Sequence, residues 1–227
     1  MQLAILLLAS GRSTRMGGAT PKVYLPLAGT PVLLRTARRL RELDPQAEVV
    51  LAIHPDDRDR HLTPLLPELA ALGISKVVDG GPSRQESMRR ALDATGADRD
   101  LILIHDAARP CFPLPASRQA IARAAQVGAA LLAVPAADTL KRVSEEGVVR
   151  STLDRDGVWL AQTPQVVQRQ LLRRGLEAGL QGTDDVSLVE QSGTPVEVVP
   201  GCVRNLKITT PSDLELAELL VTLEDTP

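Results

Sequence analysis

The stretch LLLASGRSTRMGGATPK, residues 6–22, decides the fold class of this chain. Its apolar first part stops in a loop that contains Gly11, Gly17 and Gly18 and finishes at Lys22. A short apolar run bounded by glycine is typical of a buried parallel strand, and parallel strands end where α/β proteins bind their ligands. Glycines let the backbone approach a ligand closely, and basic side chains supply positive charge. The stretch therefore predicts a first strand followed by a phosphate-binding loop.

This loop differs from two common phosphate-binding motifs. It has no consecutive glycine, lysine and hydroxyl residue, so it is not a Walker A sequence. Ser13 stands two places after Gly11, where the dinucleotide motif G-x-G-x-x-G has its second glycine. A plain turn between strand and helix, with its arginines in solvent, is the alternative that the loop by itself leaves open.

Strand-like apolar runs recur along the chain and are separated by segments with helical periodicity. They cover residues 2–9, 48–53, 75–78, 101–105 and 129–134. This alternation predicts a Rossmann-like α/β fold with a mostly parallel central sheet flanked by helices. No linker or low-complexity run divides the 227 residues, so we expect a single domain over 1–227.

Three helix starts carry local signatures. Thr30 and Pro31 precede one helical run, Ser83 forms a capping box with Glu86, and Thr210 with Pro211 and Asp213 precedes the last helix.

Composition excludes several classes of function. With 26 basic and 28 acidic residues the net charge is −2, which gives no general attraction to nucleic acid or an anionic membrane. Tyr24, Phe112 and Trp159 are the only aromatic residues, too few for a base-stacking platform. Cys111 and Cys202 form no disulfide framework or zinc pattern, which fits a reducing cytoplasm. The first apolar run is shorter than a membrane span, and no hydrolase motif is present.

Residues 136–160 break the alternation. The segment KRVSEEGVVRSTL, with a turn at Glu146 and Gly147, predicts an inserted β-hairpin arm. Isolated two-stranded hairpins are only marginally stable, so we expect this arm to pack on a second subunit and to mediate dimerisation. A hairpin that folds back onto its own domain is the alternative.

Three further segments supply candidate site residues. Gly81 and Ser87 follow the run at 75–78, where a glycine turn can approach a planar base or form a simple turn. Asp106 in HDAARP ends a strand, where it can bind hydroxyls or a metal, or cap the next turn. Lys207 in NLKITTP is expected in a short strand before a capped helix, a position usually occupied by an edge charge.

Taken together, seven segments resemble one family in sequence and in order, nearly from end to end. The chain resembles the 2-C-methyl-D-erythritol 4-phosphate cytidylyltransferases of the non-mevalonate isoprenoid pathway. The segments are ASGRSTRMGGATPK, VDGGPSRQES, HDAARPC, DTLKR, LDRDGVWLAQTPQ, TDDVSLVE and RNLKITTPSDL. Ser10, Ser13 and Val23 depart from the residues usual there, and the Cβ of Ser13 disfavours a left-handed conformation.

The resemblance implies roles for individual residues. It implies that Arg15 and Lys22 are catalytic and bind the triphosphate with the help of Lys207. The implied nucleotide-binding residues are Ala9, Ser10, Gly11, Gly81, Ser87 and Asp106. The implied binding residues for the polyol phosphate are Asp106, Arg109, Thr139 and Arg155, of which Thr139 and Arg155 would serve the site of a neighbouring subunit.

The implied activity is transfer of CMP from CTP to 2-C-methyl-D-erythritol 4-phosphate, giving 4-diphosphocytidyl-2-C-methyl-D-erythritol and pyrophosphate by in-line attack. Magnesium held mainly by the triphosphate, without assigned side-chain ligands, is the expected cofactor, and a cytoplasmic homodimer is the expected state. A cytidylyltransferase for ribitol 5-phosphate or another polyol phosphate is the nearest alternative. A non-catalytic module that senses CTP is more distant. A nicotinamide-dependent oxidoreductase would need an acidic residue where His54 and Pro55 stand.

Overall fold

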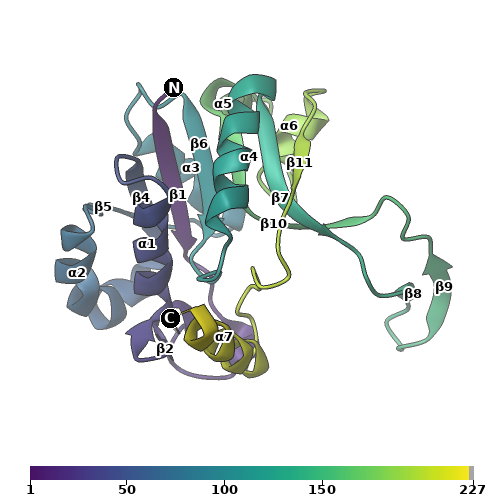
Figure 1. Ribbon diagram of the computed structural model, residues 1–227, viewed down its shortest axis with the longest axis horizontal. Coiled ribbons are helices and arrows are strands. Elements are labelled where there is room, and N and C mark those ends of the chain that lie inside the picture. The colour runs from purple at the N-terminus through teal and green to yellow at the C-terminus, as the bar shows by residue number, and fades with distance from the viewer. Residues whose placement is uncertain (225–227) are drawn as a thin grey trace.

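Strand β1 lies inside a seven-stranded sheet, hydrogen-bonded to β4 on one side and β6 on the other (Figure 1). The computed structural model describes residues 1–224. The sheet has the order β11-β7-β10-β6-β1-β4-β5, and only β10 runs antiparallel to its neighbours. Its strands are β1 (Leu3–Ala9), β4 (Glu48–Ile53), β5 (Lys76–Asp79), β6 (Leu101–Asp106), β7 (Ala129–Pro135), β10 (Trp159–Gln168) and β11 (Glu197–Pro200). The predicted mostly parallel α/β sheet is confirmed.

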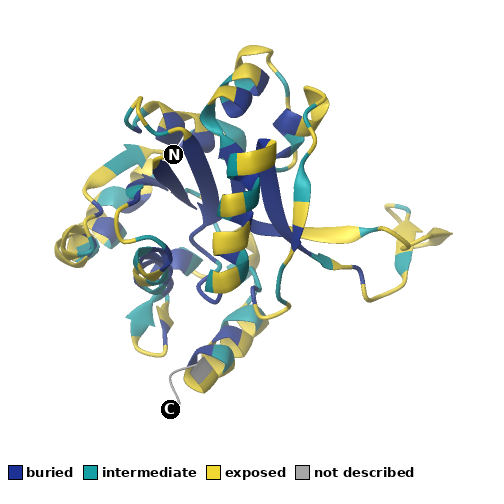
Figure 2. Cartoon of the chain, turned by 45° about the horizontal axis from the view of Figure 1, so that its top comes forward, coloured by how far each residue is buried: buried dark blue, intermediate teal, exposed yellow. Residues whose placement is uncertain are grey.

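Side chains on β1 alternate between two apolar layers. Leu3, Ile5 and Leu7 pack into the layer formed by α1 (Val32–Leu43), α2 (Leu66–Ala71) and α4 (Leu114–Val127). Leu6 and Leu8 pack into the opposite layer, formed by α3 (Arg84–Asp93), α5 (Arg169–Glu177) and α6 (Ser187–Gln191). Figure 2 shows the central strands of the sheet buried and α4 exposed on its outer face. Burial on both faces explains why the strand reads as a continuous apolar run.

Two of the sheet's strands, β10 and β11, have no counterpart among the predicted strands. In β10 the buried side chains include Gln162, Thr163 and Gln165, so the strand lacks an apolar signature. Strand β11 is a four-residue edge strand paired only with β7. A search for hydrophobic periodicity does not detect strands with buried polar residues or short edge strands.

Two of the three predicted helix caps are confirmed. The Ser83 hydroxyl accepts a hydrogen bond from the backbone N–H of Glu86 at 3.0 Å, but the Glu86 carboxylate pairs with Arg89 and Arg90, so only this half of the predicted capping box is present. At the start of α7 (Pro211–Glu224), the Asp213 carboxylate accepts from the backbone N–H of Thr210 at 2.8 Å. The predicted cap at Thr30 is wrong, because Thr30 lies in β3 (Thr30–Pro31), paired with β2 (Pro26–Leu27), and α1 begins without a side-chain cap.

The hairpin predicted within 136–160 is present as β8 (Leu140–Val143) and β9 (Val149–Leu153). It forms a separate two-stranded sheet that projects away from the helices (Figure 1). Its apolar side chains are exposed, with Val143, Val148 and Val149 each at half or more of their maximal exposure. The hairpin therefore presents apolar surface that its own domain does not cover.

The expected short strand around Lys207 is wrong. Residues 205–209 belong to no strand, and their backbone pairs with the loop after β6 and with the Asp213 side chain. The Ile208 N–H donates to the carbonyl of Ala108 at 2.9 Å, and Arg109 donates to the carbonyl of Asn205 at 2.6 Å. Ile208 is buried with Leu27 and with Ala217 of α7. These contacts fix the C-terminal segment at the end of β6.

Within residues 1–224 no helix is long and apolar enough to cross a membrane.

Candidate active site

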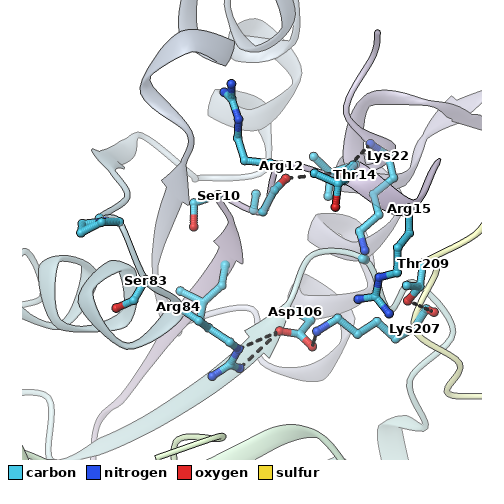
Figure 3. Close-up of a pocket in the computed structure, with 18 residues that line it drawn as sticks. Ser10, Arg12, Thr14, Arg15, Lys22, Ser83, Arg84, Asp106, Lys207 and Thr209 are labelled. Atoms are coloured by element: carbon cyan, nitrogen blue, oxygen red, sulfur yellow. Dashed lines mark hydrogen bonds and ion pairs between the residues drawn. The ribbon is translucent and has the colours of Figure 1, made fainter. Parts of the chain in front are cut away.

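A cavity of about 360 Å³ opens at the carboxyl ends of β1 and β6 (Figure 3). Segments far apart in the sequence supply its walls: the loop after β1, the turn before α3, the end of β6 and the segment before α7. The lining residues are Leu8, Ala9, Ser10, Gly11, Arg12, Ser13, Thr14, Arg15, Lys22, Val23, Gly81, Pro82, Ser83, Arg84, Asp106, Ala108, Lys207 and Thr209. The cavity therefore lies at the carboxyl ends of the parallel strands, where α/β folds bind their ligands.

The glycine-rich loop closes on itself around Ser13. Ser13 adopts the left-handed conformation, with φ of 56°, although its Cβ disfavours it. Its hydroxyl accepts a hydrogen bond from the backbone N–H of Lys22 at 3.1 Å, which ties the two ends of the loop together. In Figure 3 Arg15 and Lys22 point into the cavity, whereas Arg12 points away, and its guanidinium pairs with Asp56 at 2.9 Å.

Three cationic side chains converge in the cavity. Arg15 and Lys22 come from the loop after β1, and Lys207 reaches the same region from the segment before α7 (Figure 3). Burial, together with the charges of Lys207 and Arg15, lowers the pKa of Lys22 to about 8, against the opposing effect of Asp106. Burial is the main cause of this lowered pKa, and the neighbouring cations Lys207 and Arg15 lower it further. Such a site attracts a polyanion.

Asp106, at the end of β6, is a buried carboxylate surrounded by cations. Its Oδ2 lies 2.8 Å from the Lys207 ammonium and 3.6 Å from Nε of Arg109, and its Oδ1 lies 3.3 Å from the Arg84 guanidinium. Burial alone raises the pKa of a carboxyl group, but Arg84 and Lys207 hold the pKa of Asp106 well below its usual value. The group is therefore ionised, and it holds Lys207 in place.

A second part of the wall requires glycine. A Cβ on Gly80 would lie 2.5 Å from the Cβ of Ser10, and one on Gly81 would lie 2.1 Å from Cγ of Glu86. The Ser87 hydroxyl accepts from the backbone N–H of Gly81 at 3.0 Å and from the Ser10 hydroxyl at 2.9 Å. Ser87 is 1% exposed and lies outside the lining, so it holds the wall from behind.

His105 and Arg109 form a buried support beneath Asp106. The His105 Nε2 donates to the carbonyl of Arg109 at 3.1 Å, and its Nδ1 lies 3.0 Å from the Thr163 hydroxyl, which leaves Nδ1 as the acceptor. Burial lowers the pKa of His105 to about 3, so the ring is neutral at physiological pH. The side chain of Arg109 is only 12% exposed and lies outside the lining of the cavity.

The structure brings most of the predicted residues together. Lining the cavity are Ala9, Ser10, Gly11, Arg15, Lys22, Gly81, Asp106 and Lys207. Thr139 and Arg155 lie instead at the base of the hairpin, where Arg155 donates to the carbonyl of Ala137 and both side chains are exposed. Within one chain these two residues do not meet the cavity.

Three charged residues in or beside the lining were not predicted: Arg12, which points away from the cavity, Arg84 and Asp185. Arg84 lines the cavity and pairs with both Asp106 and Asp185, the latter at 2.7 Å. One sequence signal could have found Arg84: it is the first residue of α3, where the helix dipole disfavours positive charge. An arginine at that position indicates a partner elsewhere. Asp185 carried no such signal.

Acidic residues that could bind a metal do not cluster. Across the described ranges, no group of three or more His, Cys, Asp or Glu side chains is arranged to hold a metal ion. The fixed positive charges of the cavity can thus bind and polarise an anion. Asp106, the single carboxylate in the lining, already contacts three cations.

Comparison with known proteins gives consistent matches. A family model described as 2-C-methyl-D-erythritol 4-phosphate cytidylyltransferase matches residues 3–223. A protein of that name from Symbiobacterium thermophilum is 41% identical over 223 residues, covering 96% of this chain and 92% of that protein. One from Solibacter usitatus is 39% identical over 235 residues, covering 97% and 96%. The crystal structure of the enzyme of that name from Thermus thermophilus is similar with a TM-score of 0.79 and 32% identity, covering 98% of this chain and 100% of that one.

Proposed function

The chain belongs to the 2-C-methyl-D-erythritol 4-phosphate cytidylyltransferase family, and we propose that the cavity at the ends of β1 and β6 is where CTP and the polyol phosphate react. As a member of this family the protein transfers the cytidylyl group of CTP to 2-C-methyl-D-erythritol 4-phosphate in the non-mevalonate pathway. The observation that supports the assignment to this cavity is the convergence of Arg15, Lys22 and Lys207.

The triphosphate lies against the glycine-rich loop. Backbone N–H groups of the loop and the ammonium of Lys22 face it from one side, and Lys207 faces it from the other. Ser10, Gly11 and Gly81 form the part of the wall that receives cytosine and ribose, because all three line the cavity and the two glycines leave the backbone open to a ligand. Ser87 positions this wall through its hydrogen bond to Gly81.

The reaction needs positive charge more than it needs a base. An oxygen of the substrate phosphate forms a bond to the α-phosphorus of CTP, and the bond from that phosphorus to the bridging oxygen breaks, so that pyrophosphate leaves with the electron pair. A phosphate monoester has a second pKa of about 6, so the nucleophile is already ionised at neutral pH. His105 is neutral, buried and hydrogen-bonded on both nitrogens, which fits a structural role. Arg15, Lys22 and Lys207 stabilise the charge that develops at the α-phosphorus.

Magnesium is the proposed cofactor. When bound, a divalent cation neutralises triphosphate oxygens and acts as a Lewis acid. Asp106 is occupied by Arg84, Arg109 and Lys207, so we expect the ion to be held mainly by phosphate oxygens instead of by a cluster of carboxylates.

A homodimer is the proposed assembly. The hairpin of β8 and β9 exposes apolar side chains, and an isolated hairpin is only marginally stable. Packing on a second copy would cover this surface and would carry Thr139 and Arg155 toward the partner's cavity, where they would bind the polyol phosphate together with Asp106. Arg109 would support Asp106 from beneath. A cytoplasmic location is proposed as well, in keeping with the reduced state of Cys111 and Cys202, neither of which is in a disulfide.

A direct assay tests this function. The purified protein is incubated with CTP, magnesium and either 2-C-methyl-D-erythritol 4-phosphate or ribitol 5-phosphate, and pyrophosphate release is measured. We expect release with the first polyol phosphate and little with the second. Preference for ribitol 5-phosphate would assign the alternative substrate, and CTP binding without any release would indicate a nucleotide sensor.

A further inference from the structure

Asp185 lies next to the candidate active site but outside the lining of the cavity. It is 2% exposed, and its Oδ1 accepts from the guanidinium of Arg84 at 2.7 Å. The backbone N–H groups of Asp185 and Val186 donate to Oε1 of Gln165 in β10, at 3.0 and 3.2 Å. The carboxylate is therefore held at a fixed place by the central sheet.

From Asp185 a row of alternating charges leads to the cavity. Arg84 contacts Asp185 at 2.7 Å but Asp106 only at 3.3 Å, whereas Lys207 contacts Asp106 at 2.8 Å. Figure 3 shows Asp106 between the ends of Arg84 and Lys207. Arg84 is thus drawn toward Asp185, and the closer partner of Asp106 is Lys207.

We propose that Asp185 is a positioning residue for Lys207, acting through Arg84 and Asp106. This inference rests on the proposed function of the cavity. The negative charge of Asp185 keeps the guanidinium of Arg84 from forming a bidentate ion pair with Asp106. Without that charge Arg84 competes with Lys207 for the same carboxylate, and the ammonium loses its fixed position beside the substrate phosphates.

Charge balance supports the same role. Two carboxylates, Asp106 and Asp185, face three cations, Arg84, Arg109 and Lys207. The cluster carries one net positive charge, and Lys207, with a side chain 38% exposed, is its member most open to the cavity. Asp185 neutralises Arg84 so that this charge is concentrated at Lys207.

Packing does not account for a carboxylate at this position. The Oδ2 of Asp185 is buried and finds no hydrogen-bond partner within residues 1–224, and burial raises the pKa of the group against the effect of Arg84. A buried carboxylate with an unpartnered oxygen costs stability. Replacing it by the isosteric amide keeps an acceptor for Arg84 and removes the charge.

A double-mutant cycle tests the inference. Asp185→Asn, Arg84→Gln and the double variant are assayed with CTP and 2-C-methyl-D-erythritol 4-phosphate. Asp185→Asn lets Arg84 compete with Lys207 for Asp106, and Arg84→Gln releases the Oδ1 of Asp106, so that Asp106 no longer holds Lys207 in a fixed place. Each single change should therefore lower kcat about 10- to 100-fold, as expected when a catalytic group is misplaced, with a smaller change in the KM for CTP. Because both changes disturb one chain of contacts, the double variant should be within about threefold of Arg84→Gln alone.

Asp184→Asn is the matched control. Asp184 accepts from the N–H of Ser187, the first residue of α6, at 3.1 Å and from the Gln165 amide at 2.9 Å, so its loss disturbs the same turn without removing the partner of Arg84. Its effect on kcat should multiply with that of Arg84→Gln, whereas that of Asp185→Asn should not. Thermal unfolding of each variant separates loss of folding from loss of positioning.

Three results would overturn the inference: wild-type kcat in a folded Asp185→Asn protein, multiplicative effects in the Asp185–Arg84 cycle, or wild-type kcat in Arg84→Lys. The last variant keeps the charge but cannot span both carboxylates, so it tests the idea even where Asp185→Asn fails to fold. If the wild-type protein releases no pyrophosphate, the proposed function fails instead, so the two failures are distinguishable.

Discussion

The ammonium of Lys207 lies 2.8 Å from the carboxylate of Asp106, which joins the segment before α7 to the end of the central strand β6. The contact is possible because the backbone of Ile208 pairs with Ala108 in the loop after β6. It turns a lysine near the C-terminus into part of a cavity that Arg15 and Lys22 of the first loop also line. The predictions below depend on this convergence.

Removal of either Arg15 or Lys22 of the first loop should abolish most of the activity without unfolding the protein. Lys22→Ala and Arg15→Ala should each lower kcat by about 10²–10³-fold, the usual loss when a group that stabilises transition-state charge is removed. Steady-state pyrophosphate release measures the effect, and circular dichroism checks the fold. Arg174→Gln removes an exposed cation of α5 away from the cavity and should leave kcat unchanged. A near-normal kcat for Lys22→Ala would contradict the assignment.

The pH dependence of kcat/KM for CTP should report Lys22. Burial and the charge of Lys207 lower its pKa to about 8, and only the protonated ammonium attracts the triphosphate. The value of kcat/KM should therefore fall as the pH rises through about 8. In Lys207→Gln one cause of the lowered pKa is gone, so the descending limb should move to higher pH. A profile that stays flat to about pH 10 would show that Lys22 is not the titrating group.

Asp106 should contribute to stability as well as to the site. Asp106→Asn leaves Arg84, Arg109 and Lys207 with less compensation, and breaking such a buried pair typically costs about 3–5 kcal/mol. Because the pKa of Asp106 is held below its unfolded value, this stabilisation is present above the unfolded pKa of about 4 and declines as the pH falls through the folded pKa. Urea denaturation should show a large difference between wild type and variant at pH 7 and a smaller one in acid. Equal stability at pH 7 would contradict the buried pairing.

The hydroxyl of Ser13 should tune CTP binding. It accepts from the N–H of Lys22, and the residue adopts a left-handed conformation that glycine adopts more readily. Ser13→Ala keeps the strain and loses the hydrogen bond, which should weaken CTP binding about fivefold. Ser13→Gly loses the hydrogen bond but relieves the strain, so its affinity should lie between those of Ser13→Ala and wild type. Titration calorimetry gives the order, and the reverse order would refute this role of the hydroxyl.

Mixed dimers should test the hairpin. If Arg155 serves the cavity of a second copy, Arg15→Ala and Arg155→Ala chains that are each nearly inactive should regain activity after subunit exchange. Each heterodimer then contains one cavity with both arginines intact, so recovery should approach about a quarter of the wild-type rate when exchange is random. Tagged chains verify the exchange. Verified exchange without recovered turnover would mean that each chain completes its own site.

The sheet could be predicted where burial produces an apolar run. Strands such as β1 and β4 are covered on both faces, so nearly every side chain is apolar and the run stands out. Strand β10 was not predicted because it contains buried polar residues: Gln162 and Gln165 hydrogen-bond to polar groups inside the fold, including Asn205 and Asp184. A sequence shows the type of a buried polar residue but not the partner that makes its burial possible.

The same limit applied to the site. Arg15 and Lys22 were predictable because a glycine-rich loop after a strand has a local signature, and Asp106 because it ends a strand. Arg84 and Asp185 were missed because the ion pair between them joins residues about 100 positions apart and has no local pattern. Lys207 was assigned through the family resemblance, but its predicted strand was wrong because the segment docks on a loop.

A crystal structure of the protein with CTP and magnesium is the most direct test of the central claim, that cations from both ends of the chain act on one triphosphate. The account predicts phosphate oxygens within hydrogen-bond distance of the Lys22 ammonium, the Arg15 guanidinium and the Lys207 ammonium in the same cavity. Triphosphate density elsewhere, or in this cavity but beyond the reach of Lys207, would contradict it.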